Sequence, residues 1–317
     1  MTPRLTHYLP LTGLVVLVPA IWILIRFARG IDIADILREL QDYSPERVLL
    51  AVGCSLLALI LMGLYEARAL REAGRPLGVL RPMLVTAIAA PIGHGVGLAT
   101  LTGGAMRYRL YAPLGIPAST IGTVIVYTAL PYVLSLSLLL AFALIFGASQ
   151  AARLLGLPVA SVVALGMIGL AVNAGYVLLT ALRRTPISLG RFTFRLPSLP
   201  FTLLQYAIGS LAIICLATIL DLFLPPELPL SFPAHLGVYV LSLIAGNLSN
   251  VPAGLGIFDA TLLLLLRDVP SGTVLAAIVA YRVVYELLQL VLALGLLALY
   301  EFGSRHGLAG RLWRTPQ

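Results

Sequence analysis

The sequence predicts an all-α, polytopic membrane protein, a class indicated by its composition, its long apolar runs and two interrupted apolar segments. Of its 317 residues, 60% are hydrophobic and 11% are charged. A soluble globular domain carries about 25% charged residues, so this chain lacks the polar side chains needed to cover a water-facing surface. The composition therefore excludes a cytosolic enzyme, a nucleic-acid-binding module and a disordered protein.

Six apolar runs are long enough to cross a bilayer as helices, which takes about 20 apolar residues each. They cover residues 9–27, 48–65, 119–146, 157–182, 201–224 and 272–300. The first run has no small-residue cleavage site after it, so we interpret it as a retained span and not as a signal peptide. Between the first two runs, residues 30–47 mix Ile and Leu with charged residues, which predicts a short helix along the membrane surface.

Two further apolar segments, residues 83–101 and 234–266, are interrupted by glycine and proline. Irregular backbone at membrane depth is tolerated only where it is buried in protein or lines a wet cavity. One such segment in each half of a chain is typical of an inverted-repeat transporter, so we expect two re-entrant or broken-helix segments around a central cavity. The alternative is that the glycines only allow close helix packing.

The basic residues indicate the topology. All of them are arginine, because the chain contains no lysine, and the formal net charge is +8. If both interrupted segments are hairpins, most arginines between the spans fall on the cytoplasmic side together with both termini. The first hairpin then enters from inside and the second from outside. We expect one integral membrane domain over residues 1–317, with halves at about 1–150 and 151–305 and a short basic tail at 306–317.

The first polar cluster follows the first interrupted segment and contains Arg107, Arg109 and Tyr111. Guanidinium groups bind phosphate oxygens in a bidentate fork, and tyrosine rings favour the membrane interface. The cluster therefore suits an anionic headgroup, with an ordinary basic and aromatic membrane edge as the alternative.

The second polar cluster lies in the second interrupted segment and contains Asn247, Asn250, Gly254, Gly256 and Asp259. The two asparagines are three residues apart, so on a helix they share a face and can bond freed backbone groups or a headgroup. The carboxylate lies close to a predicted helix start, where the helix dipole favours it, so a purely structural role is the alternative.

The third polar cluster lies inside the last apolar run. Arg282 and Glu286 are four residues apart, so they meet on one helical face, which Gln289 continues. Charged residues inside a span are costly and usually pair or face a cavity. His94 lies between glycines and suits either a proton relay or a hydrogen bond to freed backbone.

Three motifs in this order resemble the membrane region of bacterial lysylphosphatidylglycerol synthases: TGGAMRYRLY at residues 102–111, PAGLGIFD at 252–259 and YRVVY at 281–285. The resemblance covers most of the chain. It implies the flippase region of the bifunctional multiple peptide resistance factors, which moves aminoacylated phosphatidylglycerol to the outer leaflet. The second motif departs from the usual P-G-G-x-G-x-x-E pattern at Ala253 and Asp259. After the last span there is no room for the synthase domain, so the resemblance does not imply aminoacyl transfer.

The leading hypothesis is a lipid translocase of the bacterial inner membrane, with a phospholipid as its partner. No nucleotide, cofactor, metal or nucleic acid is expected, because no P-loop or metal-binding spacing is present. The expected substrate-binding residues are Arg107, Arg109, Tyr111, Asn247, Asn250, Gly254, Gly256, Asp259, Arg282 and Glu286. Two alternatives remain: an accessory subunit that binds a lipid-modifying enzyme of a phospholipid, hopanoid or glycolipid pathway, and an intramembrane enzyme that uses His94 or Asp259.

Overall fold

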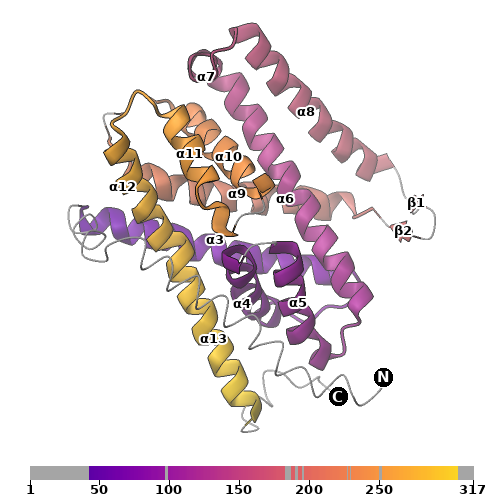
Figure 1. Cartoon of the computed structure of the whole chain (residues 1–317). Helices are drawn as coiled ribbons and strands as arrows, with labels where there is room; N and C mark the ends of the chain where they lie inside the picture. Colours follow the sequence, from indigo (N-terminus) through magenta and orange to yellow (C-terminus); the bar gives the residue numbers. More distant parts are fainter. Residues whose placement is uncertain are drawn as a thin grey trace.

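The chain folds as a bundle of helices, as the sequence predicts (Figure 1). The structure is a computed structural model that describes residues 43–305 apart from 97–98, 183–186, 190–191, 195, 227, 229 and 250–251. The first predicted span, and all but the last residues of the predicted surface helix at 30–47, lie outside the described residues. The first half contains α3 (Pro45–Glu72), α4 (Leu80–Val96), α5 (Ala99–Tyr111), η1 (Ala112–Leu114), α6 (Ala118–Phe146) and α7 (Ala148–Leu155).

The second half contains α8 (Val159–Leu182), α9 (Leu199–Phe223), α10 (Phe232–Ser249), η2 (Pro252–Gly254), α11 (Ile257–Leu265), α12 (Ser271–Arg282), the π-helical turn η3 (Val283–Leu287) and α13 (Leu288–Arg305). A short antiparallel hairpin of β1 (Ile187–Leu189) and β2 (Phe192–Phe194) connects α8 to α9. The all-α class is therefore confirmed, with this hairpin as a small addition.

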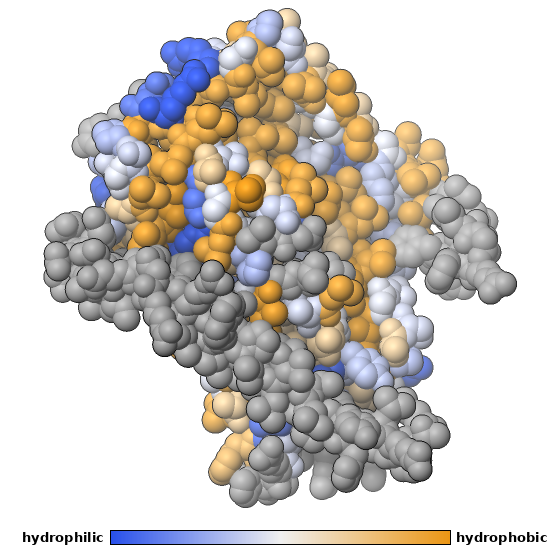
Figure 2. Space-filling view, viewed as in Figure 1, coloured by the Kyte–Doolittle hydropathy of each residue, from blue (hydrophilic) through white to orange (hydrophobic). Residues whose placement is uncertain are grey.

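Within the described ranges, six helical segments are long and apolar enough to cross a membrane. Five of them, α3, α6, α8, α9 and the continuous α12–η3–α13, correspond to predicted spans. The sixth, α10, lies in the second interrupted segment. Figure 2 shows the described surface of this face as mainly hydrophobic, with hydrophilic residues gathered mostly toward the ends. The chain is thus a multi-pass membrane protein.

Both interrupted segments form helical hairpins. In the first, α4 packs against α5, and in the second, α10 packs against η2 and α11. In the first, the break lies within the predicted segment, but α4 continues as a helix through Pro91 and the glycines around His94 to Val96. Pro91 is buried inside the bundle, where neighbouring helices can compensate for its lost backbone hydrogen bond. The second hairpin turns through left-handed backbone at Ala253, Gly254 and Gly256.

The two hairpins open at opposite ends of the bundle. At one end, the last residue of α3 accepts a hydrogen bond from the backbone of Ser198, and Arg109 on α5 pairs with Glu301 on α13. At the other end, the side chain of Gln150, on α7, accepts a hydrogen bond from the backbone of Ser231, just before α10. Figure 1 shows α4 and α5 in the lower half of the view and α10 and α11 in the upper half.

Each hairpin packs against the long helix of the other half, α4 against α13 and α10 against α6. The long helices that directly precede the two hairpins, α3 and α9, pack against each other. The same packing pattern therefore recurs in both halves with opposite direction, as an inverted repeat produces. This arrangement brings the tip of α4 against η2, in the middle of the bundle.

Candidate functional site

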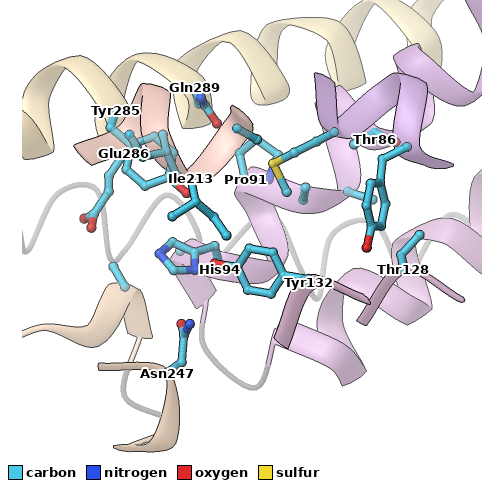
Figure 3. A pocket seen from close by; sticks show the side chains of 18 of the residues that line it. Thr86, Pro91, His94, Thr128, Tyr132, Ile213, Asn247, Tyr285, Glu286 and Gln289 are labelled. Atoms are coloured by element: carbon cyan, nitrogen blue, oxygen red, sulfur yellow. The ribbon is translucent and has the colours of Figure 1, made fainter. Parts of the chain in front are cut away.

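A cavity of about 420 Å³ lies where the two hairpins meet. Residues of both hairpins line it together with residues of α3, α6, α9, η3 and α13. Most of its wall is apolar, but it also contains several polar or ionisable side chains, namely Glu66, Thr86, His94, Arg107, Thr128, Tyr132, Asn247, Tyr285, Glu286 and Gln289. Figure 3 shows His94 in the middle of this group, between Tyr132 and Glu286. A central cavity between the interrupted segments is what the sequence predicts.

Glu66 organises the end of the cavity formed by the first hairpin. Its Oε2 accepts hydrogen bonds from Nε and Nη2 of Arg107 at 2.9 and 2.8 Å, and from the hydroxyl of Thr86 at 2.8 Å. Its Oε1 accepts a hydrogen bond from the hydroxyl of Tyr111 at 2.8 Å. Both oxygens of the carboxylate therefore accept hydrogen bonds, as a buried charge requires. The side chain of Arg107 is 14% exposed, whereas that of Glu66 is 1% exposed.

Arg282 organises the end formed by the second hairpin, and its guanidinium is 2% exposed. It donates to Oδ1 of Asp259 from Nη2 at 2.6 Å and from Nε at 3.2 Å. It also donates to Oε2 of Glu286 at 2.8 Å and to the carbonyl of Ala253 at 3.3 Å. The predicted pairing of Arg282 with Glu286 is present, although the turn between them is π-helical. One guanidinium thus holds two carboxyl groups.

The turn of the second hairpin is built by its glycines. Gly254 has a φ of +62°, and a Cβ added there would lie 3.1 Å from the Cα of Gly246 on α10. Gly256 has a φ of +85°, and its backbone N–H donates to Oδ2 of Asp259 at 2.9 Å. Left-handed backbone favours glycine because the residue has no Cβ. The predicted role of Asp259 at a helix start is therefore present, in addition to its bond with Arg282.

Four of the predicted site residues line this cavity, namely Arg107, Asn247, Gly254 and Glu286. Gly256, Asp259 and Arg282 do not line it and lie behind Glu286, to which Arg282 is bonded. Tyr111 is buried behind it against Glu66. Arg109 lies apart, because it pairs with Glu301 and does not line the cavity. Asn250 lies outside the described residues.

Gln289 also differs from the prediction. It lines the cavity, but its amide donates to the carbonyl and the hydroxyl of Ser55 on α3, at 3.0 and 3.2 Å, and not to the charged pair on its own helix. The π-helical turn at residues 283–287 lies between Arg282 and Gln289, so the regular helical spacing that the prediction assumed does not hold there.

Sequence reasoning missed Glu66 and Thr86. Glu66 follows the end of an apolar run and precedes Arg68 and Arg71, so it resembles an ordinary charge at a membrane edge. In the structure α3 continues to Glu72, which places Glu66 inside the helix and against the first hairpin. A carboxylate directly after an apolar run was the available signal. Among the described residues, no group of three or more His, Cys, Asp or Glu side chains could hold a metal.

Comparisons with known proteins agree with this architecture. Inner membrane protein YbhN of Escherichia coli is 31% identical over 290 residues, which is 87% of each chain. Uncharacterized protein slr0712 of Synechocystis sp. is 33% identical over 254 residues, 79% of this chain and 78% of its own. Phosphatidylglycerol lysyltransferase of Staphylococcus haemolyticus is 34% identical over 80 residues, only 9% of its length. Residues 11–293 match the lysylphosphatidylglycerol synthase TM region, so the chain belongs to that family.

Proposed function

We propose that the protein is a lipid translocase whose central cavity carries a phospholipid headgroup between the two leaflets. The observation that supports this most directly is a cavity between two hairpins, within an apolar bundle, that is lined by ionisable side chains. Ionisable residues inside membrane segments are costly and usually mark a substrate or ion pathway. A headgroup that crosses the bilayer needs such a polar site, while its acyl chains can stay in the lipid.

The charges of the cavity favour a headgroup that carries an amine as well as a phosphate. Arg107 and Arg282 are already paired with carboxylates, so a phosphate must share or displace a protein carboxylate to bind them. The second cluster has two carboxyl groups for one guanidinium, and Glu286 lines the cavity, where it can contact a cationic substituent. An aminoacylated phospholipid presents both groups.

The opposite directions of the two hairpins give the headgroup a route to the cavity from each side of the membrane. One hairpin opens toward each end of the bundle, and both reach the cavity. Small movements of one hairpin at a time would expose the cavity to one side and then to the other, as in transporters built from inverted repeats.

The location we propose is the bacterial inner membrane, because the relative YbhN is named an inner membrane protein. The end that carries Arg71, Arg75, Arg81 and Arg109 would face the cytoplasm according to the positive-inside rule. Both termini would then be cytoplasmic.

The experiment is a leaflet-resolved assay in proteoliposomes that contain phosphatidylglycerol, its lysyl derivative or phosphatidylethanolamine. An amine-reactive, membrane-impermeant probe measures how fast each amine-bearing lipid reaches the outer leaflet, and a headgroup-labelled phosphatidylglycerol serves for the anionic lipid. We expect wild type to accelerate transfer of the lysyl lipid most, and Arg107→Gln to lower that rate about tenfold, which is the effect of about 1.4 kcal/mol on the barrier.

The matched control is Arg109→Gln, two residues along the same helix and also in an ion pair, but outside the cavity lining. Its transfer rate should stay within a factor of two of wild type. Unchanged distribution of every lipid with folded protein would contradict translocation. Copurification of a stoichiometric lipid-modifying enzyme in that case would support the accessory-subunit alternative.

A further inference from the structure

His94 lies in the central cavity without a hydrogen-bond partner among the described residues. It lines the cavity near the end of α4, and its ring lies beside that of Tyr285, with the centroids 6.1 Å apart. Figure 3 shows the ring in the middle of the cavity, with the side chain of Asn247 pointing toward it. The backbone around His94 stays helical. The hydrogen bond to freed backbone that the sequence allows for this histidine is therefore not seen within the described ranges.

His235 on α10, the other histidine within the described ranges, has a different environment. Its Nε2 lies 3.2 Å from the carbonyl oxygen of Ala217, and its Nδ1 lies 3.4 Å from the carboxylate of Asp221. It is buried and does not line the cavity. Polar groups inside proteins are nearly always hydrogen-bonded, and both ring nitrogens of histidine can take part. His235 thus connects two helices, whereas the His94 ring is available to a ligand in the cavity.

The charged side chains of the cavity are already paired with one another. Arg107 is paired with Glu66 at one end, and Arg282, behind the cavity wall, is bonded to Asp259 and Glu286 at the other. An anion that enters the cavity therefore meets guanidinium groups that are already occupied. Besides His94, the titratable residues that line the cavity are Tyr65, Glu66, Arg107, Tyr132, Tyr285 and Glu286. Among these lining groups, the imidazole is the one that gains a positive charge near neutral pH.

We propose that His94 takes up a proton together with the phosphate of a lipid headgroup and donates a hydrogen bond to a phosphate oxygen. The proton comes from water and adds to the ring nitrogen that lacks one, so that both nitrogens become donors. The positive charge of the imidazolium offsets the negative charge of the phosphodiester, and hydrogen bonds between such charged groups are strong. Each bound headgroup is then accompanied by one proton. This inference rests on the proposed function, because it concerns the ligand of the same cavity.

The test is isothermal titration calorimetry of the full chain in detergent with dioctanoyl phosphatidylethanolamine. Titrations in two buffers of different ionisation enthalpy give the number of protons taken up, and we expect about one proton per lipid at about pH 7.5. Because the protonated ring binds the phosphate, Kd should fall as the pH falls, by about tenfold per pH unit at most. Dioctanoylglycerol, which has the same chains without the phosphate, should cause no proton uptake.

The informative variant is His94→Gln, which keeps a hydrogen-bonding side chain that cannot become charged. Its proton uptake should fall to nearly zero, and its Kd should not change with pH. At about pH 8.5, where the wild-type ring is mostly neutral, the two Kd values should agree within about threefold. The matched control is His235→Gln, which changes a histidine outside the cavity lining and should keep the proton uptake of wild type. A purely structural role of His94 would not remove the proton uptake selectively.

Lipid binding by wild type without proton uptake would overturn the inference and leave the proposed translocation intact. Proton uptake that persists in His94→Gln would also overturn it, because another group, such as Glu286, would then carry the proton. Absence of binding of the phospholipid would contradict both proposals. Glycerophosphoethanolamine, the same headgroup without acyl chains, distinguishes the source of the phosphate. If it binds as tightly as the lipid and with the same proton uptake, His94 is supported as the phosphate ligand, but the cavity is assigned to soluble phosphodiesters.

Discussion

The two ends of the cavity differ in whether the arginine of the ion pair comes from a hairpin or from a long helix. Arg107 comes from the first hairpin and pairs with one carboxylate, Glu66, on a long helix. Arg282 comes from a long helix and pairs with Asp259 on the second hairpin and with Glu286 on the adjoining π-helical turn. The packing of the two halves is similar, but the hairpin supplies the cation in one half and an anion in the other.

This difference shows that related architecture does not fix the charge of a site. The first cluster is a neutral pair whose carboxylate is shared with Thr86 and Tyr111. The second has two carboxyl groups for one guanidinium. We therefore expect removal of the arginine to lower the free energy of unfolding more in the second cluster than in the first.

The largest effect should come from Arg282→Gln. This change leaves two carboxylates next to each other without a counter-charge, and breaking a buried ion pair in this way costs about 3–5 kcal/mol. Arg107→Gln should cost less, about 1.5–3 kcal/mol, because Glu66 keeps the hydrogen bonds from Thr86 and Tyr111. Reversible unfolding in detergent measures both free energies of unfolding. Equal losses in the two variants, or a larger loss in Arg107→Gln, would contradict the comparison.

An intermediate effect should come from the tips of the hairpins. Gly254→Ala places a Cβ on left-handed backbone and close to Gly246, so the free energy of unfolding should fall by about 1–3 kcal/mol. The control is Gly95→Ala near the tip of the first hairpin, where the added Cβ meets only the Leu290 side chain at 3.5 Å. That change should stay within about 0.5 kcal/mol of wild type. Equal losses of stability in the two variants would contradict this prediction, because the two hairpin tips would then tolerate an added Cβ equally.

The smallest effect should come from Arg109→Gln. The Arg109 side chain is 9% exposed, but its partner Glu301 is 25% exposed and can be solvated once the arginine is lost, so the cost should be about 1 kcal/mol. The unfolding curve should therefore nearly coincide with that of wild type, in contrast to Arg107→Gln. A loss as large as that of Arg107→Gln would mean that the first cluster extends to Arg109.

Much of the fold could be predicted because each signal is local in the sequence. The apolar runs give the spans, and the glycine and proline residues near Pro91 and Pro252 locate the two hairpins. The pairing of Arg282 with Glu286 could also be predicted, because four residues of helix bring them together. The exact position of the break after Val96 could not, because Pro91 and several glycines are all local breakers and packed neighbours keep α4 helical at Pro91.

The sequence alone determined that the chain enters a membrane, which segments are long and apolar enough to cross it and where the charged residues are, because transfer into a bilayer depends mainly on the residues of each segment itself. Apart from the pairing of Arg282 with Glu286, only the tertiary structure decided which charges meet. Glu66 and Arg107 are 41 residues apart, and Arg282 and Asp259 are 23 apart, on different helices. Their contacts depend on how whole helices pack, and no local spacing encodes that geometry.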